Sequence, residues 1–522
     1  QRQMCIRDRP LSSALSNFIF YKIPILGNDF PIIVLWLVSA ATFFTFYYGF
    51  INIRAFKSAL KLVFGKSDVK GTNGEITHFQ ALSTAISGTV GIGNIGGVAV
   101  AISIGGPGAA FWLFLAGFLG MSTKFVECTL GVKYRKSNSD GSVSGWPMYY
   151  LESFLSSRGY PGYGKMLGSF YAISLVIGCF GIGNMFQSNQ AYVQFLSITG
   201  GDNSFFADKG WLFGILLASA VALVIIGGIK SIANAASRIV PSMAGLYLLS
   251  ALTILMLSID KIDDALNLII QSAFGLESFT GGAIGALIIG FQRSAFSNEA
   301  GMGTASIAHS AVETNEPITE GLVSLLEPFI DTMVICTLTS LVIITTLYTD
   351  GSPFGDLEGI AITSAAFAYH IGWFPVLLGI AALLFAFSTA IAWAYYGLKS
   401  WTYIFGESAV SELIFKIIFC FFVCLGCMIK LSAVLDFSDA MVFVIAVPNI
   451  KGLYIFAPEV KLDLISYLER HKLALQICRH RPSAIDVTRR QTKWTRRVVH
   501  DKLHYVQQLT SLVRETLHHI LD

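Results

Sequence analysis

Long apolar runs separated by short polar segments dominate this chain. Eleven runs approach or exceed the roughly 20 residues that a helix needs to cross a bilayer. They cover residues 31–53, 79–103, 108–132, 166–195, 211–228, 240–258, 280–305, 321–347, 374–397, 411–430 and 434–457. We refer to the first as the leading helix and to the others as helices 1 to 10. The pattern predicts an all-α polytopic membrane protein.

Glycine and polar residues interrupt two of these runs. In helix 1, residues 87–94 read Ser-Gly-Thr-Val-Gly-Ile-Gly-Asn, and in helix 6 residues 291–303 include Arg293, Glu299 and four more polar side chains. A helix in lipid must pair its backbone groups internally, so such clusters predict breaks whose peptide groups face a cavity. Glycine is also common in membrane helices for packing reasons, but the polar side chains in both clusters favour breaks.

The two interrupted helices occupy matching places in two sets of five. This arrangement predicts a 5+5 inverted repeat, although the halves share no visible residue identity. Thirteen basic residues lie in the loops on one side of helices 1 to 10, and three on the other side. By the positive-inside rule the first side is cytoplasmic, so the C-terminal tail is expected in the cytoplasm. We expect the loop at residues 348–373 to fold over an outward-facing vestibule.

Composition narrows the class of protein. The chain is 54% hydrophobic and 13% charged, with a mean hydropathy of +0.63, which excludes an ordinary soluble enzyme. Its eight cysteines are scattered along the chain, and we interpret them as packing residues. The sequence has neither a nucleotide-binding Gly-x-x-x-x-Gly-Lys-Ser/Thr loop nor a catalytic motif. We therefore expect no enzymatic activity and no cofactor, and transport driven by an ion gradient.

Three motifs, at residues 87–97, 291–303 and 385–396, resemble the signatures of the alanine or glycine:cation symporter family, and the resemblance extends over about residues 30–465. It implies a leucine-transporter-like fold. It also implies uptake of alanine or glycine, coupled to sodium and sometimes to protons, across the plasma membrane of a bacterium or archaeon.

A zwitterionic substrate needs hydrogen-bond donors for its carboxylate. The amides near Gly91, Ile92 and Gly93 are placed for this role at the start of the outer half-helix, with Thr89 and Asn94 on the same break. The family resemblance adds Gln187 of helix 3. Asn184 and Asn189 in that helix are weaker candidates, since they can equally serve as hydrogen-bonding links between helices.

Helix 8 supplies the candidate cation site. By the resemblance, the hydroxyls of Ser388 and Thr389 meet backbone carbonyls near Ser87 and Val90, and such oxygen ligands suit sodium. Thr389 also belongs to the predicted substrate site. Trp393 lies one turn beyond Thr389, and we expect it to close the pocket against large side chains, although a purely packing role is open to it.

Several charged residues fall within the spans, where they are functional or paired. We assign Arg293, Glu299 and Asp331 to a gating or structural network, with Glu299 and Asp331 on the cytoplasmic side. Any of them is a possible proton carrier. Lys124 and Glu127 are interpreted as an ion pair at the membrane interface.

The chain divides into three expected domains. Residues 1–30 form an extracytoplasmic segment whose first nine residues resemble a sequence artefact, residues 31–457 form the transporter, and residues 458–522 form a basic cytoplasmic tail. The tail contains 12 Lys and Arg against 7 Asp and Glu. We expect it to contact anionic lipid headgroups or to be exposed to solvent, and we expect neither a metal site nor nucleic-acid binding.

Together these features predict a sodium-coupled importer of alanine or glycine in the plasma membrane. Proton coupling is one alternative, and an amino-acid sensor or a channel is a more distant one. We expect the partners to be the amino acid, sodium and membrane lipid. The oligomeric state is open, with a monomer as the expectation.

Overall fold

The computed structural model describes residues 19–25, 28–65, 74–137, 143–275, 282–349, 351 and 354–480. The first nine residues and the end of the tail, for which we made predictions above, lie outside these ranges. The chain forms two compact units, residues 1–454 and 455–522. The three-domain division expected from the sequence stays a prediction.

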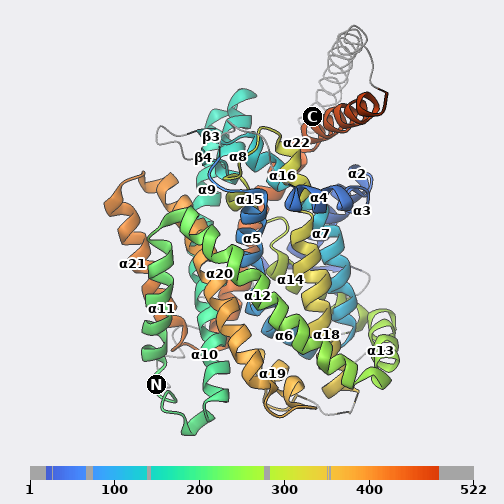
Figure 1. The fold of residues 1–522 in the computed structure, drawn as a ribbon, viewed down its shortest axis with the longest axis vertical. Helices are drawn as coiled ribbons and strands as arrows, with labels where there is room; N and C mark the ends of the chain where they lie inside the picture. Colours follow the sequence, from blue (N-terminus) through green and yellow to red (C-terminus); the bar gives the residue numbers. More distant parts are fainter. Residues whose placement is uncertain are drawn as a thin grey trace. The chain divides into compact units, whose positions relative to one another are not determined.

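Two short antiparallel hairpins accompany a helical structure (Figure 1). They are formed by β1 (Lys22–Ile25) with β2 (Asn28–Pro31) and by β3 (Lys136–Ser137) with β4 (Val143–Ser144). The helices of the first half are α2 (Ile32–Tyr47), α3 (Ile51–Arg54), α4 (Phe56–Phe64), α5 (His78–Thr89), η1 (Ile92–Asn94), α6 (Gly96–Gly105), α7 (Gly108–Lys133), α8 (Pro147–Ser157), α9 (Pro161–Phe180), η2 (Gly181–Met185), α10 (Phe186–Ile198), η3 (Gly201–Asn203), α11 (Gly210–Ile225), α12 (Gly228–Leu257), η4 (Ile259–Lys261) and α13 (Ile262–Phe274).

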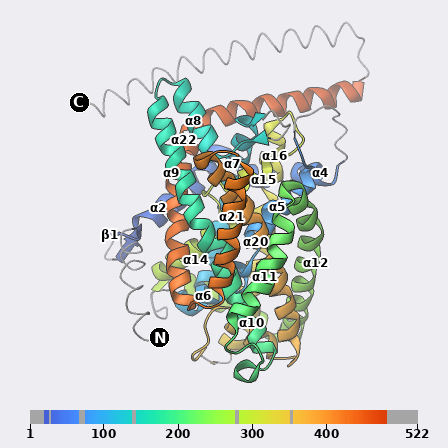
Figure 2. The same cartoon turned by 90° about the vertical axis from the view of Figure 1, so that its left-hand side faces the viewer.

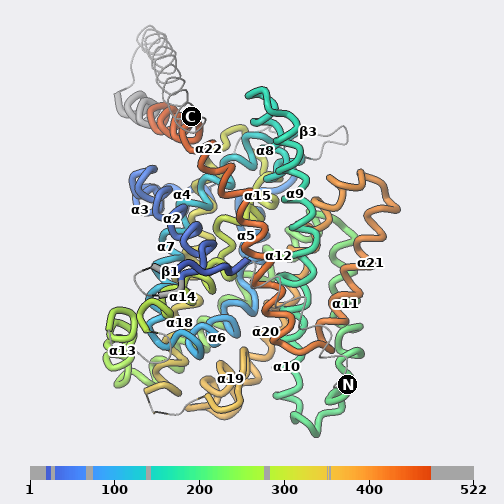
Figure 3. The backbone as a smooth tube through the Cα atoms, turned by 180° about the vertical axis from the view of Figure 1, so that it is seen from behind, coloured from blue at the N-terminus to red at the C-terminus, as the bar shows by residue number. Residues whose placement is uncertain are grey.

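The second half is also helical. Its helices are α14 (Gly282–Asn298), α15 (Ala305–His309), α16 (Pro317–Val323), α17 (Leu326–Pro328), η5 (Phe329–Cys336), α18 (Thr337–Ile343), η6 (Ile344–Tyr348), α19 (Ile360–Ala368), α20 (Phe374–Phe405), α21 (Ala409–Gly426) and α22 (Leu431–His480). Helices α11 and α21 pack side by side at one edge (Figures 1 and 3).

Helix 1 is broken where the glycine cluster predicts. Helix α5 ends at Thr89 and α6 begins at Gly96, and the two halves are bent by 60° around a single 3-10 turn, η1. Gly91 at the break is extended, with φ −127° and ψ −162°. The bend frees backbone groups in the middle of an apolar segment, so other parts of the chain must satisfy them.

Helix 6 is also interrupted as predicted. Helix α14 ends at Asn298, and the chain then takes positive φ angles at Glu299 (55°), Gly301 (99°) and Gly303 (82°) before α15 begins. Only glycine adopts this region without steric cost, so the glutamate in it is strained. The Glu127 Oε1 atom of α7 accepts hydrogen bonds from the freed amides of Gly301 (2.8 Å) and Gly303 (3.1 Å).

Wide π-helical turns, which the sequence did not predict, occur in helices 3 and 7. In helix 3 the turn is η2, between α9 and α10, and in helix 7 the turns are η5 and η6. A π-turn accommodates one extra residue and changes the direction of the side chains that follow. Both helices supply polar residues to the site described below.

Within the described residues, seven helices are long and apolar enough to cross a membrane, and the bent pair of α5 with η1 and α6 is an eighth candidate. Two shorter apolar helices, α2 and α11, and the 17-residue α14 match the other expected runs. Each expected run therefore contains helix among its described residues, and the count of eleven spans stays a prediction. The 348–373 loop contains α19, which packs on α6 and α10.

A buried ion pair replaces the interfacial pair expected at Lys124 and Glu127. The Lys124 ammonium lies 2.9 Å from Glu327 Oε1, and both side chains are completely buried. Glu127 instead binds the backbone at the helix 6 break. The expectation was wrong because α15 and α16 pack on α7 and cover the two side chains, so that Lys124 pairs with Glu327 of α17 inside the protein.

We predict that Lys124→Met destabilises the protein by about 3–5 kcal/mol, because it leaves the Glu327 carboxylate buried without its partner. Replacing both residues, in Lys124→Met with Glu327→Leu, should recover much of this loss. Thermal unfolding in detergent measures both effects. Lys416→Met, which removes a partly exposed pair with Glu412, is the control and should change stability by about 0.5 kcal/mol or less. Equal losses at both lysines would contradict the prediction.

Candidate functional site

Two side chains, one from helix 1 itself and one from helix 3, pair with the backbone at the helix 1 break. The Gly91 amide donates to Asn94 Oδ1 (2.9 Å), and the Ile92 amide donates to Gln187 Oε1 (2.9 Å). A Cβ at Gly91 would lie 2.6 Å from Thr389 Oγ1 and 2.9 Å from Gln187 Oε1. Four predicted site residues, from helices 1, 3 and 8, therefore meet around a glycine that leaves no space for a side chain.

This arrangement differs from the expected one in one respect. The sequence predicts that the amides at the break are open to a substrate carboxylate, whereas two of them are bonded to carboxamide oxygens. A buried amide without an acceptor would cost about 1–3 kcal/mol. The Gln187 carboxamide is itself held by a bond of 3.1 Å from Nε2 to the Ile182 carbonyl in the π-turn η2.

Asn94 connects the break to helix 7. Its Nδ2 atom donates to Asp331 Oδ1 (2.5 Å), while Ser297 Oγ (2.7 Å) and Thr332 Oγ1 (2.6 Å) donate to Asp331 Oδ2. Asp331 therefore lies beside the helix 1 break, about 14 residues or roughly 21 Å into a helix that begins at Pro317. Its expected place with Glu299 in a gating or structural network on the cytoplasmic side stays a prediction.

Helices 1 and 8 meet at the predicted cation ligands. Ser87 Oγ donates to the Ser388 carbonyl (2.7 Å), and Ser388 Oγ donates to the Phe385 carbonyl (3.1 Å). The Thr389 hydroxyl is buried and has no hydrogen-bond partner among the described residues. Since buried hydroxyls are normally bonded, this oxygen is suited to a ligand that the protein does not itself supply.

Trp393 joins the two breaks. Its indole N–H lies 3.2 Å from the Gly88 carbonyl in helix 1 and 3.0 Å from Glu299 Oε1 in the helix 6 break. Thr304 Oγ1 donates to the other Glu299 oxygen. The ring is completely buried, and a Cβ at Gly183 would lie 1.9 Å from its Cγ atom. Glycine in the π-turn therefore makes the room in which Trp393 lies.

Other predicted residues lie apart from this cluster or bond elsewhere. Arg293 forms an ion pair with Asp439 of α22, and Thr89 Oγ1 bonds only to carbonyls of its own helix. Gly93 packs against the Phe296 ring. Asn184 and Asn189 donate to backbone carbonyls at 419, 426 and 429, as expected for links between helices.

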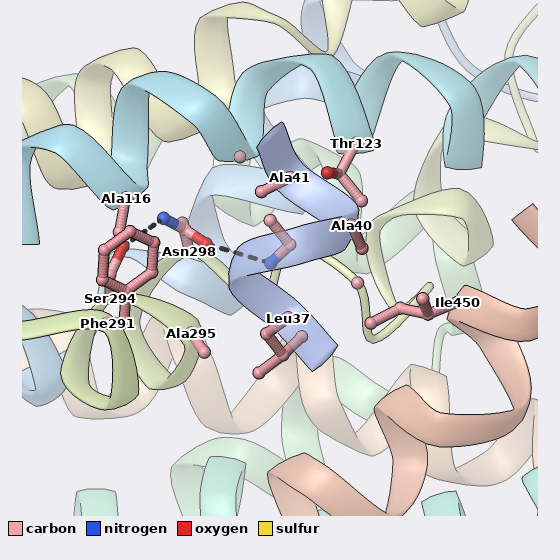
Figure 4. Close-up of a pocket in the computed structure, with 13 residues that line it drawn as sticks. Leu37, Ala40, Ala41, Ala116, Thr123, Phe291, Ser294, Ala295, Asn298 and Ile450 are labelled. Carbon is pink, nitrogen blue, oxygen red and sulfur yellow. Dashed lines mark hydrogen bonds between the residues drawn. The ribbon is translucent and has the colours of Figure 1, made fainter. Parts of the chain in front are cut away.

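A cavity of about 20 Å³, room for roughly one water molecule, lies behind the helix 6 break (Figure 4). Leu37 and Ala40 of α2, Thr123 of α7 and Ile450 line it, together with Asn298, which bonds to Ser294 and to the Ala300 amide. None of the predicted substrate or cation residues lines this cavity. It is therefore separate from the site at the helix 1 break.

The chain resembles known transporters. A model of the sodium:alanine symporter family matches residues 14–479. The sodium/alanine symporter AgcS of Methanococcus maripaludis is 38% identical, and the match covers 85% of this chain and 95% of that protein. The probable sodium/glutamine symporter GlnT of Bacillus subtilis is 31% identical, with 86% and 90% covered.

A solved structure of MhsT in complex with L-phenylalanine has the same fold. It superposes with a TM-score of 0.54 at 15% identity and covers 76% of this chain and 99% of that protein. This similarity supports the predicted leucine-transporter-like architecture and says nothing about substrate.

The family match spans nearly the whole chain, and the described helices are those of a multi-pass membrane protein. Its members are transporters, so this protein is a cation-coupled amino-acid symporter and not an enzyme. The chain belongs to the sodium:alanine symporter family.

Proposed function

We propose that this protein imports alanine or glycine together with sodium across the plasma membrane by alternating access, with its C-terminus in the cytoplasm. The observation that carries the proposal is the meeting of Gly91, Gln187 and Thr389 at the helix 1 break, where no described residue bonds to the Thr389 hydroxyl. The names of relatives such as the archaeal sodium/alanine symporter agree with it.

The substrate carboxylate would take the place of the Gln187 carboxamide at the Ile92 amide. A carboxylate accepts from backbone amides more strongly than a neutral amide oxygen, so the exchange is favourable. Thr89, Gly91, Gly93 and Asn94 line the same break. Binding of the substrate would therefore displace the Gln187 side chain from the Ile92 amide.

The size of the substrate follows from Trp393. Its indole ring is fixed between Gly183 and the Gly88 carbonyl, so it cannot move away from the break without losing a buried hydrogen bond. A hydrogen or a methyl group fits beside such a wall better than a branched side chain. Trp393 therefore favours glycine and alanine.

The sodium ion would bind the hydroxyls of Ser388 and Thr389 and the carbonyls of Ser87 and Val90. The bond from Ser87 Oγ to the Ser388 carbonyl holds helix 1 against helix 8 at this place. An ion that bridges the two helices would strengthen this contact, which couples its binding to the position of the break. Arg293 with Asp439, and Glu299 with Trp393, would act as gates.

Proton coupling is the second candidate. Four carboxylates, of Glu127, Glu299, Glu327 and Asp331, are completely or almost completely buried. A Bacillus subtilis relative, 36% identical, has the name putative sodium/proton-dependent alanine carrier protein YrbD. Buried carboxylates within membrane spans commonly carry protons.

Uptake of radiolabelled alanine into proteoliposomes tests the proposed function. We expect accumulation when an inward sodium gradient is imposed, competition by glycine, and little competition by leucine. Accumulation driven by a proton gradient in the absence of sodium would favour the second candidate. Binding of alanine without accumulation under either gradient would contradict both.

Thr389→Ala should raise the sodium concentration for half-maximal uptake by at least about fivefold, because it removes one ion ligand. The measurement is initial alanine uptake as a function of sodium concentration. Ser400→Ala is the matched control, since Ser400 is also a buried hydroxyl of α20 that bonds to nothing in the described part of the chain but lies about 16 Å further along the helix. An unchanged sodium dependence in Thr389→Ala would reject the assignment.

Gln187→Glu should weaken alanine binding by about tenfold or more, because a second carboxylate at the Ile92 amide repels that of the substrate. Equilibrium binding of labelled alanine in saturating sodium measures this effect. Ser197→Asp places the same charge on the exposed face of α10 and should bind alanine normally. Normal affinity in Gln187→Glu would remove Gln187 from the substrate site.

A further inference from the structure

One buried carboxylate connects the halves of the two broken helices that lie on the same side of the site. Glu320 of α16 contacts Nδ1 of His78, the first residue of α5, with one oxygen, and Nδ1 of His309, the last residue of α15, at 2.5 Å with the other. A carboxylate can only accept, so both Nδ1 atoms carry a proton. Helices α5, α15 and α16 lie together in both views (Figures 1 and 2).

Histidine is rare before the C-terminal tail, and it is concentrated at Glu320. Of the nine histidines in the chain, only His78, His309 and His370 precede residue 471. Two of these three meet at one carboxylate, although His78 and Glu320 are separated by 242 residues of sequence. The third, His370, bonds to Ser258 elsewhere in the molecule.

Backbone contacts reinforce the same junction. Ile76, just before α5, forms a parallel bridge with Val312, just after α15. The Glu75 amide donates to the Ala311 carbonyl (2.7 Å), and the Arg135 guanidinium donates to the Val312 carbonyl (2.6 Å). Movement of α5 away from α15 must therefore break at least one of the two imidazole contacts together with this bridge.

The His78 imidazole is the group in this junction whose charge can change between about pH 5 and pH 8. Arg135 acts electrostatically on Glu320 and stays charged. Lys124 is paired with Glu327. The remaining cations on the neighbouring helices α4 and α12 have exposed side chains: Lys57, Lys61, Lys230 and Arg238.

We propose that His78, His309 and Glu320 form a proton-binding clamp on the cytoplasmic ends of the broken helices, and that proton binding slows their opening toward the cytoplasm. The proposal rests on the proposed transport function and orientation. The proton adds to Nε2 of His78, and the resulting imidazolium donates from Nδ1 to Glu320 in a charge-assisted bond, which is stronger than the neutral one.

His78 is the proton acceptor because its side chain is 11% exposed, whereas that of His309 is completely buried. Nε2 of His309 has no partner among the described residues. A proton there would create a buried cationic donor without an acceptor, which is costly. His309 therefore acts as a positioning residue for Glu320.

Thiol labelling tests the clamp without the need for substrate. In the full chain with its native cysteines replaced, Ala308→Cys places a thiol in a completely buried position beside His309. Ser157→Cys, at an exposed position, gives the reference labelling rate at each pH. Dividing the rate at residue 308 by the rate at residue 157 removes the pH dependence of the thiol reaction itself. We expect this ratio to fall about tenfold between pH 7.5 and pH 5.5 in detergent.

Two clamp variants and one control sharpen the test. Glu320→Gln should raise the labelling ratio about tenfold at pH 7.5, because the acceptor loses its charge. His78→Asn keeps a donor near the place of Nδ1 but cannot titrate, so it should fold and lose the pH dependence. His370→Asn should keep the native pH dependence. The proposal would be overturned if the labelling ratio did not change with pH, or if it fell with pH as much in His78→Asn as in the protein with the native His78.

Different results of the labelling and uptake assays reject the clamp and the proposed function. Labelling that responds to pH and to Glu320→Gln, in a protein that accumulates no alanine, would leave the clamp in place and reject the proposed function. Normal sodium-driven uptake with labelling that responds to neither would reject the clamp alone.

Discussion

The constraint on which this structure depends is that a backbone broken inside a membrane must find hydrogen-bond partners there. At the helix 1 break the partners of two amides are the carboxamide oxygens of Asn94 and Gln187. At the helix 6 break the partner is the carboxylate of Glu127, which takes two amides. Gln187 and Glu127 come from neighbouring helices, and Asn94 is itself bonded to Asp331 of helix 7, so the breaks are held in place by the helices around them. A transporter needs such a break to be stable when empty and also able to exchange partners with a substrate.

The two breaks also act on each other. The Trp393 indole bonds to the Gly88 carbonyl in one and to Glu299 in the other, and Glu299 has a backbone conformation that glutamate rarely adopts. Asn94 extends this connection through Asp331 to helix 7. Any ligand that changes the position of one break therefore changes the energy of the other. Such a contiguous set of buried bonds is a physical basis for coupling ion and amino acid.

Local features of the sequence predict much of this architecture. The apolar runs locate the helices, and the clusters around Gly91 and Gly301 locate both breaks. Glycine among polar residues is costly in lipid unless the backbone and side chains there bind a partner. Pairings across the sequence were harder to find. The contacts of Lys124 with Glu327, and of His78 and His309 with Glu320, join segments that no local pattern connects. Gln187 entered the site only through the family resemblance. The π-turns escaped notice because a π-turn has the same apolar composition as an α-helix. Glu127 is a carboxylate within an apolar run, so the sequence marks it as needing a partner. We expected that partner to be Lys124, whereas Glu127 binds backbone amides at the helix 6 break.

The π-turn at η2 has a consequence for the comparison of relatives. Successive residues of a helix point about 100° apart, so the one extra residue in this turn sets the direction of everything after it in helix 3. A relative that lacks one residue between Gly181 and Met185 would keep an intact helix with an almost identical sequence, yet its counterpart of Gln187 would face a different neighbour. A single gap in an alignment at this place therefore marks a helix 3 whose later polar side chains face different neighbours, which is a reason to measure that relative's substrate separately.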